Sequence, residues 1–361
     1  MFEELGFQNL TAPQAVVYFA LVIGVAFGAL AQITKFCFRR ALVGADRRAA
    51  ASVWFAALAV AVIGTQAAVG AGLIAFDDHR FMAAELSWLA ISLGGLLFGA
   101  GMVLARGCAS RLTVLGATGN LRALTVILVF AVAAHTTMKG LLAPMRVALG
   151  EITVPLGEVT SLAALPGGGW VFAALIAAVS VVIAARSNAR LSTLGLAAIL
   201  GALVPLAWVG TGFILYDDFD PVAFESLSFT RPASDTLFWT IAGTSVSPGF
   251  GTGLIGGVLA GALAASLLTG TFVWESFENA RQTGRYLTGA VLMGVGGVLA
   301  GGCTVGAGLA GVPTLSVAAV LAIVMMAAGA LATDLVLRKT ASRSSGAGGA
   351  RPTTQALQPA E

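Results

Sequence analysis

Two stretches of the sequence decide the fold: GGLLFGAGMVLARGC at residues 94–108 and GAVLMGVGGVLAGGC at residues 289–303. They lie 195 residues apart, 9 of their 15 aligned positions are identical, and each ends in a Gly-Cys pair. Both are apolar enough to form most of a membrane-spanning helix, which needs about 20 residues. Glycine is common where membrane helices touch, so the shared glycines alone are weak evidence of a repeat. Helix packing does not explain a cysteine at the end of both copies, which indicates an internal repeat.

The composition agrees with a membrane protein. The chain has 361 residues, of which 58% are hydrophobic and only 10% are charged, whereas a soluble domain carries about 25% charged residues. The mean hydropathy of +0.92 is too high for a water-exposed surface. The net charge of +3 leaves no basic face of the kind that binds nucleic acid. We therefore predict an all-α integral membrane protein, and we exclude an intrinsically disordered chain.

Apolar segments of spanning length occur nine times. We place the predicted transmembrane helices near residues 13–32, 51–76, 87–105, 121–138, 169–185, 193–214, 250–272, 285–300 and 314–337. Residues 338–361 are rich in Ser, Gly, Ala and Pro and are predicted to form a disordered tail.

The basic residues sort themselves to one side of this topology. Of the 20 Lys and Arg residues, 16 fall in alternate connecting segments, and the opposite side keeps only Arg80, Lys139, Arg146 and Arg231. Cytoplasmic loops carry the excess of Lys and Arg, so we expect an N-terminus outside and a C-terminus in the cytoplasm of a bacterial inner membrane. No cleavable signal peptide is expected, because no Lys or Arg precedes the first apolar run.

With this topology the two copies of the repeat are inverted. The third span runs inward and the eighth runs outward, an arrangement typical of transporters. We expect repeat one at about 13–138, a connecting helix at 169–185 and repeat two at about 193–337. Both repeats continue into glycine-rich segments after Cys108 and Cys303, which we predict to be re-entrant half-helices, with a third candidate at 236–249.

Three short motifs resemble those of a known family. Lys35-Phe36-Cys37-Phe38-Arg39, Arg106-Gly107-Cys108-Ala109-Ser110 and Gly301-Gly302-Cys303-Thr304-Val305 are similar to the cysteine motifs of the YeeE/YedE sulfur transport family. The resemblance covers roughly residues 13–337. It implies a nine-span inverted repeat with half-helices, cysteines near the waist of the pathway, and uptake of thiosulfate. It also implies a soluble partner, a small TusA-like sulfur-carrier protein on the cytoplasmic side.

These motifs supply the candidate transport residues, which are Cys37, Cys108, Cys303, Gly107, Gly302, Thr304 and Arg106. In an apolar site each thiol should stay protonated, and a protonated thiol is a weak, soft donor. Such donors suit the terminal sulfur of thiosulfate, while backbone N–H groups and hydroxyls suit its oxygens. The glycines are expected to let the backbone approach the ion. Arg106 and Arg111 flank Cys108 and could attract an anion, although both also fit the positively charged rim.

Other functions remain to be weighed against transport of a sulfur anion. Each cysteine could be a small buried hydrophobe, which is the commonest role of a free cysteine. A membrane thiol redox protein would need a cycling pair, for which only Cys108 and Cys303 are suitable by sequence. A pore for a small neutral solute would also use inverted half-helices. We expect no enzyme, cofactor or metal site, because catalytic motifs are absent and two histidines are too few for a histidine-based metal site. The acidic segment 216–235 has no evident role and argues against simple steering of an anion from outside.

Overall fold

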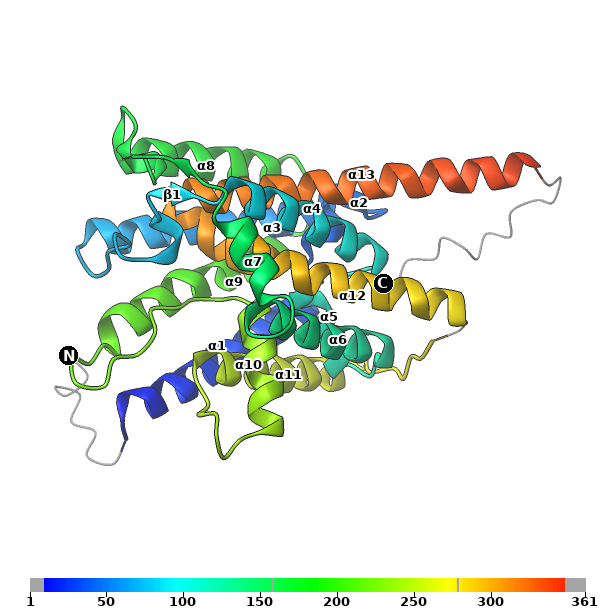
Figure 1. Cartoon of the computed structure of the whole chain (residues 1–361), viewed down its shortest axis with the longest axis horizontal. Coiled ribbons are helices and arrows are strands. Elements are labelled where there is room, and N and C mark those ends of the chain that lie inside the picture. Colours follow the sequence, from blue (N-terminus) through cyan, green and yellow to red (C-terminus); the bar gives the residue numbers. More distant parts are fainter. Residues whose placement is uncertain (1–9, 158, 188, 278, 348–361) are drawn as a thin grey trace.

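The computed structural model describes residues 10–157, 159–187, 189–277 and 279–347, and this part of the chain is mainly helical (Figure 1). Its α-helices are α1 (Ala12–Thr34), α2 (Phe38–Val43), α3 (Arg47–Gly70), α4 (Trp88–Leu104), α5 (Ala109–Ala117), α6 (Leu121–Met138), α7 (Ala143–Gly150), α8 (Gly168–Ala185), α9 (Leu191–Val209), α10 (Thr230–Ile241), α11 (Phe250–Leu268), α12 (Ala280–Leu299) and α13 (Val317–Ala347). Shorter helical turns are η2 (Arg80–Met82), η3 (Leu162–Ala164), η4 (Gly210–Ile214), η5 (Thr304–Gly311) and η6 (Val312–Thr314). Two strands, β1 (Glu85–Leu86) and β2 (Val154–Pro155), pair antiparallel.

The predicted all-α membrane fold is confirmed. Within the described residues, nine segments are long and apolar enough to span a membrane, and each overlaps one of the nine predicted spans. Three of these segments contain a break. α1 continues into α2, α4 into α5, and α12 into η5, so a long helix is followed at once by a short one.

Two boundaries differ from the prediction. The third half-helix is α10, at Thr230–Ile241, and residues 242–249, which were predicted to belong to it, form turns and irregular chain instead. Pro232 is tolerated in α10 because it lies in the first turn, where its missing N–H would have no helical partner. Figure 1 shows α10 lying across the long helices.

The last helix is longer than expected. α13 continues past the predicted end at residue 337 as far as Ala347, so the first part of the predicted tail is helical, and residues 348–361 lie outside the described structure. Asp334 forms an ion pair with Arg338 at 2.8 Å, one helical turn on, which supports the extension. The same carboxylate lies 3.9 Å from Arg47 at the start of α3, so Asp334 also joins two helices.

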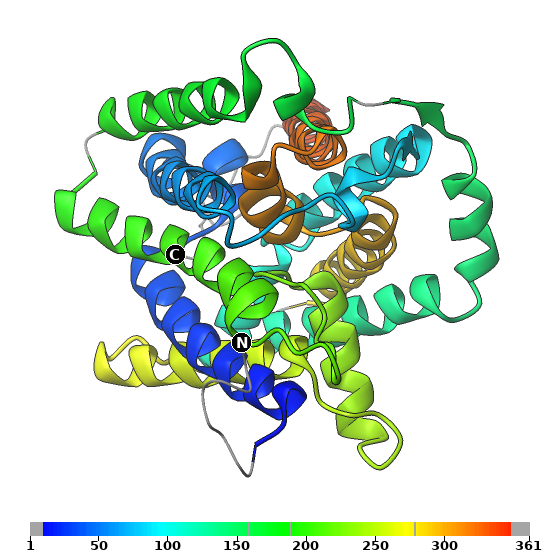
Figure 2. The same ribbon diagram turned by 90° about the vertical axis from the view of Figure 1, so that its left-hand side faces the viewer.

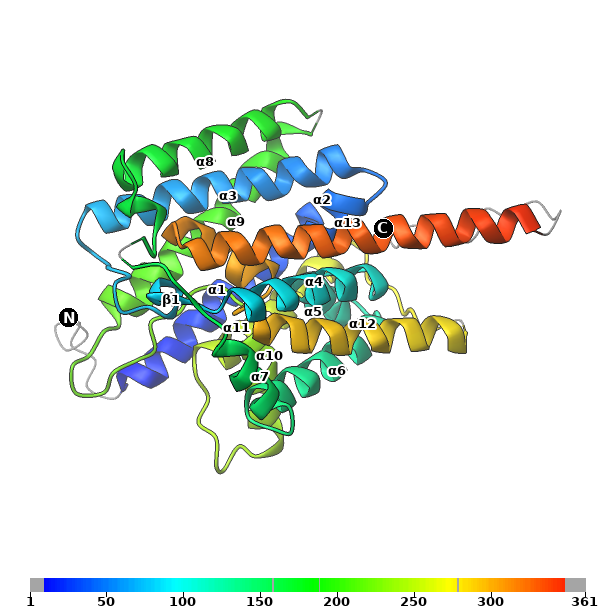
Figure 3. The same ribbon diagram turned by 45° about the horizontal axis from the view of Figure 1, so that its top comes forward.

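The two ends of the bundle differ in charge. α4 and α13 run toward one end, at the right of Figures 1 and 3, and α3 and α12 begin there. We call it the basic end, because the helix termini there carry Arg39, Arg40, Arg47, Arg48, Arg106, Arg281, Arg285 and Arg338. The opposite end, which faces the viewer in Figure 2, has loops that carry Asp77, Asp78, Asp217, Asp218 and Asp220 and is called the acidic end. The concentration of basic residues at one end agrees with the predicted sorting of Lys and Arg into alternate connecting segments.

Helix pairing repeats when the two halves of the chain are exchanged. α1 packs on α11, and their equivalents in the other half, α9 and α3, also pack on each other. Likewise α4 packs on α13, and their equivalents, α12 and α6, pack on each other. α5 packs on α6 as η5 packs on α13. α4 and α12 also pack on each other and run in opposite directions (Figure 1). This is the pairing expected of an inverted repeat, although the domain boundaries given above stay a prediction.

The contact between α4 and α12 has the reciprocity of a twofold axis. A Cβ built on Gly101 would lie 2.6 Å from the carbonyl oxygen of Gly289, and one on Gly296 would lie 2.6 Å from that of Gly94. Gly94 is the repeat equivalent of Gly289, as Gly101 is of Gly296. Each half therefore contributes the same two glycines, and only glycine lets the two backbones approach so closely.

This packing gives a stability prediction for Gly101→Ala and Gly296→Ala. Each added methyl would force α4 and α12 apart, and we expect each to destabilise the protein by about 1–3 kcal/mol. Gly256→Ala on α11 is the matched control, because nothing lies within 4 Å of a Cβ there. The control should keep or raise the thermal unfolding midpoint in detergent, since Ala favours a helix over Gly by about 1 kcal/mol. Midpoints of the Gly101 and Gly296 variants at or above the control would contradict the packing.

Candidate functional site

Each cysteine stands at the start of a short helix. All three are buried and free, and they are Cys37 before α2, Cys108 before α5 and Cys303 before η5. Two residues before each cysteine the backbone enters the left-handed region, with φ of 53° at Lys35, 57° at Arg106 and 75° at Gly301. Glycine adopts this conformation freely, whereas Lys and Arg do so with strain. The same turn therefore introduces all three thiols.

Two of the thiols touch each other. Cys37 Sγ lies 3.8 Å from Cys108 Sγ, and Cys108 Sγ lies 3.4 Å from Ser110 Oγ. Cys303 makes a separate contact, accepting a hydrogen bond from the Gly306 N–H at 3.4 Å. The structure thus places a pair of thiols at the start of α2 and α5, and a third thiol at the start of η5.

The expectation that only Cys108 and Cys303 are suitable as a redox pair is wrong. The thiol nearest to Cys108 is that of Cys37, because the turn after α1 brings it against the start of α5. The 3.8 Å separation is a van der Waals or weak hydrogen-bond contact, far longer than the roughly 2.05 Å of a disulfide.

The predicted neighbours of the cysteines are placed as follows. Thr304 is buried, with 1% of its surface exposed, and begins η5, while Arg106 is half-buried. A Cβ on Gly107 would lie 2.9 Å from Leu112 Cγ, and one on Gly302 would lie 3.0 Å from the Ala307 nitrogen. These two glycines therefore let each turn pack tightly on its own short helix, a structural role that was not expected from the sequence.

A cavity of about 350 Å³ opens at the acidic end. Its lining includes His79, Arg80, Glu225, Arg231, Gly306 and Ala310, from the loop after α3, the segment leading into α10, and η5. Gly306 is the residue whose N–H donates to Cys303 Sγ. The lining of the cavity is therefore hydrogen-bonded directly to the Cys303 thiol through Gly306.

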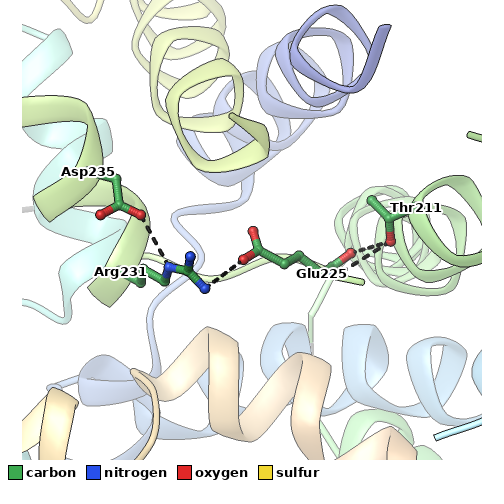
Figure 4. Close-up of polar contacts among 4 residues, drawn as sticks. All are labelled: Thr211, Glu225, Arg231 and Asp235. Atoms are coloured by element: carbon green, nitrogen blue, oxygen red, sulfur yellow. Dashed lines mark hydrogen bonds and ion pairs between the residues drawn. The ribbon is translucent and has the colours of Figure 1, made fainter. Parts of the chain in front are cut away.

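The acidic segment contributes to the wall of this cavity. Figure 4 shows Arg231 between two carboxylates, with Nη1 at 3.1 Å from Glu225 Oε1 and Nε at 3.2 Å from Asp235 Oδ2. Glu225 is fixed by its own backbone, because the Thr211 hydroxyl donates to its C=O at 2.8 Å and accepts from its N–H at 3.2 Å. Part of the acidic segment thus holds an arginine in place at the mouth of the cavity.

The remaining ionisable groups set the charge of the cavity. Burial, helped by the positive charge of Arg80, lowers the pKa of His79 to about 4, so His79 is neutral at neutral pH. Its Nδ1 accepts from the Phe81 N–H at 3.3 Å, as a neutral imidazole can. Burial raises the pKa of Glu225 above its usual range, although Arg231 and Arg80 oppose this. None of the described ion pairs involves Arg80, although its charge interacts with that of Glu225. Asp77 and Asp78 also line the cavity.

The cavity residues escaped the sequence analysis for a physical reason. Arg80 follows α3 and Arg231 lies in α10, about 150 residues later, so only the fold brings them together. The four basic residues on the outer side were a usable signal, but nothing in their spacing separates these two from Lys139 and Arg146.

Comparisons with known proteins agree with this architecture. A family model described as sulphur transport matches residues 33–332. The chain is 27% identical over 329 residues to the thiosulfate transporter TsuA of Spirochaeta thermophila, covering 85% of this chain and 94% of that protein. It is 24% identical over 321 residues to the thiosulfate transporter TsuA of Escherichia coli K12, covering 80% and 85%.

The family match begins in the last turn of α1 and ends inside α13, so it contains the three cysteine turns and most of both halves of the repeat. It spans most of the chain and confirms the resemblance that the cysteine motifs indicate. This multi-pass membrane protein belongs to the sulphur transport family.

Proposed function

We propose that the protein takes up thiosulfate across the bacterial inner membrane, with the cysteines lining the pathway. The family match and the names of the two relatives support a sulfur anion as substrate. The single observation that supports this pathway is the position of Gly306, which lines the cavity and donates its N–H to Cys303 Sγ. An anion that enters at the acidic end meets Arg80 first and the Cys303 region next.

The direction of uptake follows from the charges at the two ends. The basic end is proposed to face the cytoplasm, with the start of α1 on the outer side, because Lys and Arg concentrate in cytoplasmic loops. The cavity then opens outward. A soluble TusA-like sulfur carrier would meet the protein at the basic end, where Arg48 and Arg186 line an exposed depression.

Thiol chemistry suits this substrate. Thiosulfate carries a soft terminal sulfur that shares its negative charge, and S–H groups are weak, soft donors to such an atom. Weak donors favour transport, because a transported ion must also be released. Sulfate has no such sulfur and would gain less from the thiols. The proposed role is transport and not catalysis, since nothing in the proposed pathway requires a covalent step.

The two alternatives are separated by simple measurements. A thiol redox protein would cycle between thiol and disulfide, so three free thiols after unfolding without reductant would argue against it. A pore for neutral solutes would not need Arg80 and Arg231 at its mouth. If uptake of labelled thiosulfate is inhibited by unlabelled thiosulfate, and not by glycerol or urea, the pore for neutral solutes is excluded.

The cysteines give the first transport prediction. We expect Cys108→Ala and Cys303→Ala each to lower thiosulfate uptake about tenfold to a hundredfold at unchanged membrane abundance, because a lost donor in a desolvated site costs about 1–3 kcal/mol. Cys37→Ala should have a similar or milder effect. Cys→Ser variants should be nearly as impaired as Cys→Ala, since a hydroxyl is a shorter and harder donor.

Uptake is measured in cells with thiosulfate as the sole sulfur source, with sulfate and sulfite as controls. Normal thiosulfate uptake by the double variant Cys108→Ala, Cys303→Ala would leave these residues as packing and reject the cysteine pathway.

Side-specific labelling tests the inverted placement of the two repeat cysteines. In otherwise cysteine-free variants, a membrane-impermeant thiol reagent should reach Cys303 faster from outside, through the cavity, and Cys108 faster from the cytoplasmic side. Both reactions should be slow, because each residue is at most 1% exposed. Ser342→Cys, at an exposed position of α13, reports reagent access to the cytoplasmic side. Rapid and equal labelling of both cysteines from that side would contradict the topology.

A further inference from the structure

Arg111 is a buried cation with no carboxylate beside it. It is the only Asp, Glu, Lys or Arg in the described structure that is classed as buried, with 8% of its surface exposed. None of the ion pairs within the described residues involves it. Its side-chain hydrogen bond goes to a neutral amide, from Nη1 to Gln32 Oε1 at 3.2 Å. A buried charge of this kind is strongly unfavourable unless another group compensates it.

The position of Arg111 puts this charge beside the thiol pair. Arg111 lies in the first turn of α5, three residues after Cys108, which starts that helix and touches Cys37. The guanidinium lies within electrostatic range of the sulfur atoms of both cysteines. It also interacts with Arg40, but Arg40 is neutralised by its ion pair with Asp46. The nearby arginine is thus satisfied within the protein, and Arg111 is not.

The second repeat shows that the scaffold does not need this charge. With the offset that aligns the two cysteines, the residue equivalent to Arg111 is Gly306. With the offset that aligns FGAL at 27–30 and LGAL at 200–203, the residue equivalent to Gln32 is Pro205. Both members of the polar pair are therefore apolar in the other half, although the half-helices are packed alike. The positive charge of Arg111 is therefore present beside the cysteine of the first repeat and absent from the equivalent position of the second.

We propose that Arg111, held by Gln32, is the anion-binding residue of the inner half of the pathway, and that it binds the oxygens of the transported anion beside Cys37 and Cys108. This inference rests on the proposed function, since it makes the substrate the missing counter-charge. A guanidinium presents paired N–H donors that match two oxygens of a tetrahedral oxyanion. Arg111 then recognises charge and oxygen, while the thiols recognise sulfur.

The inference predicts opposite effects on stability and on transport. Arg111→Met keeps an unbranched apolar stem and removes the uncompensated charge. In the absence of a binding anion it should therefore raise the thermal unfolding midpoint. The same variant should raise the KM for thiosulfate about tenfold or more in proteoliposomes, because a charge-assisted hydrogen bond to the ion is lost. Arg111→Lys keeps the charge but lacks the paired N–H donors of the guanidinium, and it should have an intermediate KM.

Arg281→Gln is the matched control, because it removes one arginine from an exposed position at the same end of the molecule. It should leave both KM and the midpoint close to wild type. Thermal unfolding is followed with thiosulfate, sulfate or chloride at equal ionic strength. Thiosulfate should stabilise the wild type and the Arg281 variant, and it should leave the midpoint of Arg111→Met unchanged.

The outcomes separate this inference from the proposed function. Wild-type vesicles that take up no thiosulfate would reject the proposed function, whereas stabilisation by an oxyanion that is lost in Arg111→Met would still support an anion site. An Arg111→Met protein that transports with a KM within twofold of wild type would overturn the inference. A lower midpoint for Arg111→Met without anion would also overturn it, because Arg111 would then be a structural residue.

Discussion

A helix that ends inside a membrane protein leaves backbone carbonyl groups without partners, and this constraint organises the centre of the molecule. α1 and α4 meet it in the same way. The Phe36 N–H donates to the Ala31 carbonyl at 3.1 Å, and the Gly107 N–H donates to the Met102 carbonyl at 3.0 Å. Each bond closes a turn through a left-handed residue, after which a short helix can begin at once. The cysteines occupy the first position after these turns, so the need to satisfy the backbone places the thiols.

The inverted repeat then presents these turns from opposite ends, and the differences between the halves would give the proposed pathway a direction. In the second half, Gly306 lies next to the Cys303 thiol and lines the cavity at the acidic end. In the other half Arg111 takes the equivalent position, next to a pair of thiols. In the proposed pathway, a symmetric scaffold with an asymmetric charge would hold an ion weakly on one side and firmly on the other.

The sequence predicts the parts of the molecule that depend on composition and period. The nine spans follow from length and hydropathy, and the basic end follows from the alternation of Lys and Arg. The contact between Cys37 and Cys108 was not predictable, because it depends on left-handed turns at Lys35 and Arg106, residue types that rarely adopt that conformation. The placement of α10 and the length of α13 were missed because Pro and Ser suggest irregular chain, whereas helix position and an ion pair at Asp334 decide the outcome.

The acidic segment at the mouth of the cavity is consistent with a transported anion once its contacts are known. Glu225 and Asp235 share one arginine, Arg231, so these two carboxylates are paired with a cation of the protein. Asp77 and Asp78, from the loop after α3, also line the cavity. Arg80 also lines the cavity, and no ion pair within the described residues involves it. Attraction by Arg80, opposed by Asp77 and Asp78, would hold an anion only weakly at the mouth, and weak binding suits transport, since an ion bound tightly there would not move on. The stronger, buried charge of Arg111 lies further along the proposed pathway, where an anion that has already lost its water needs compensation most.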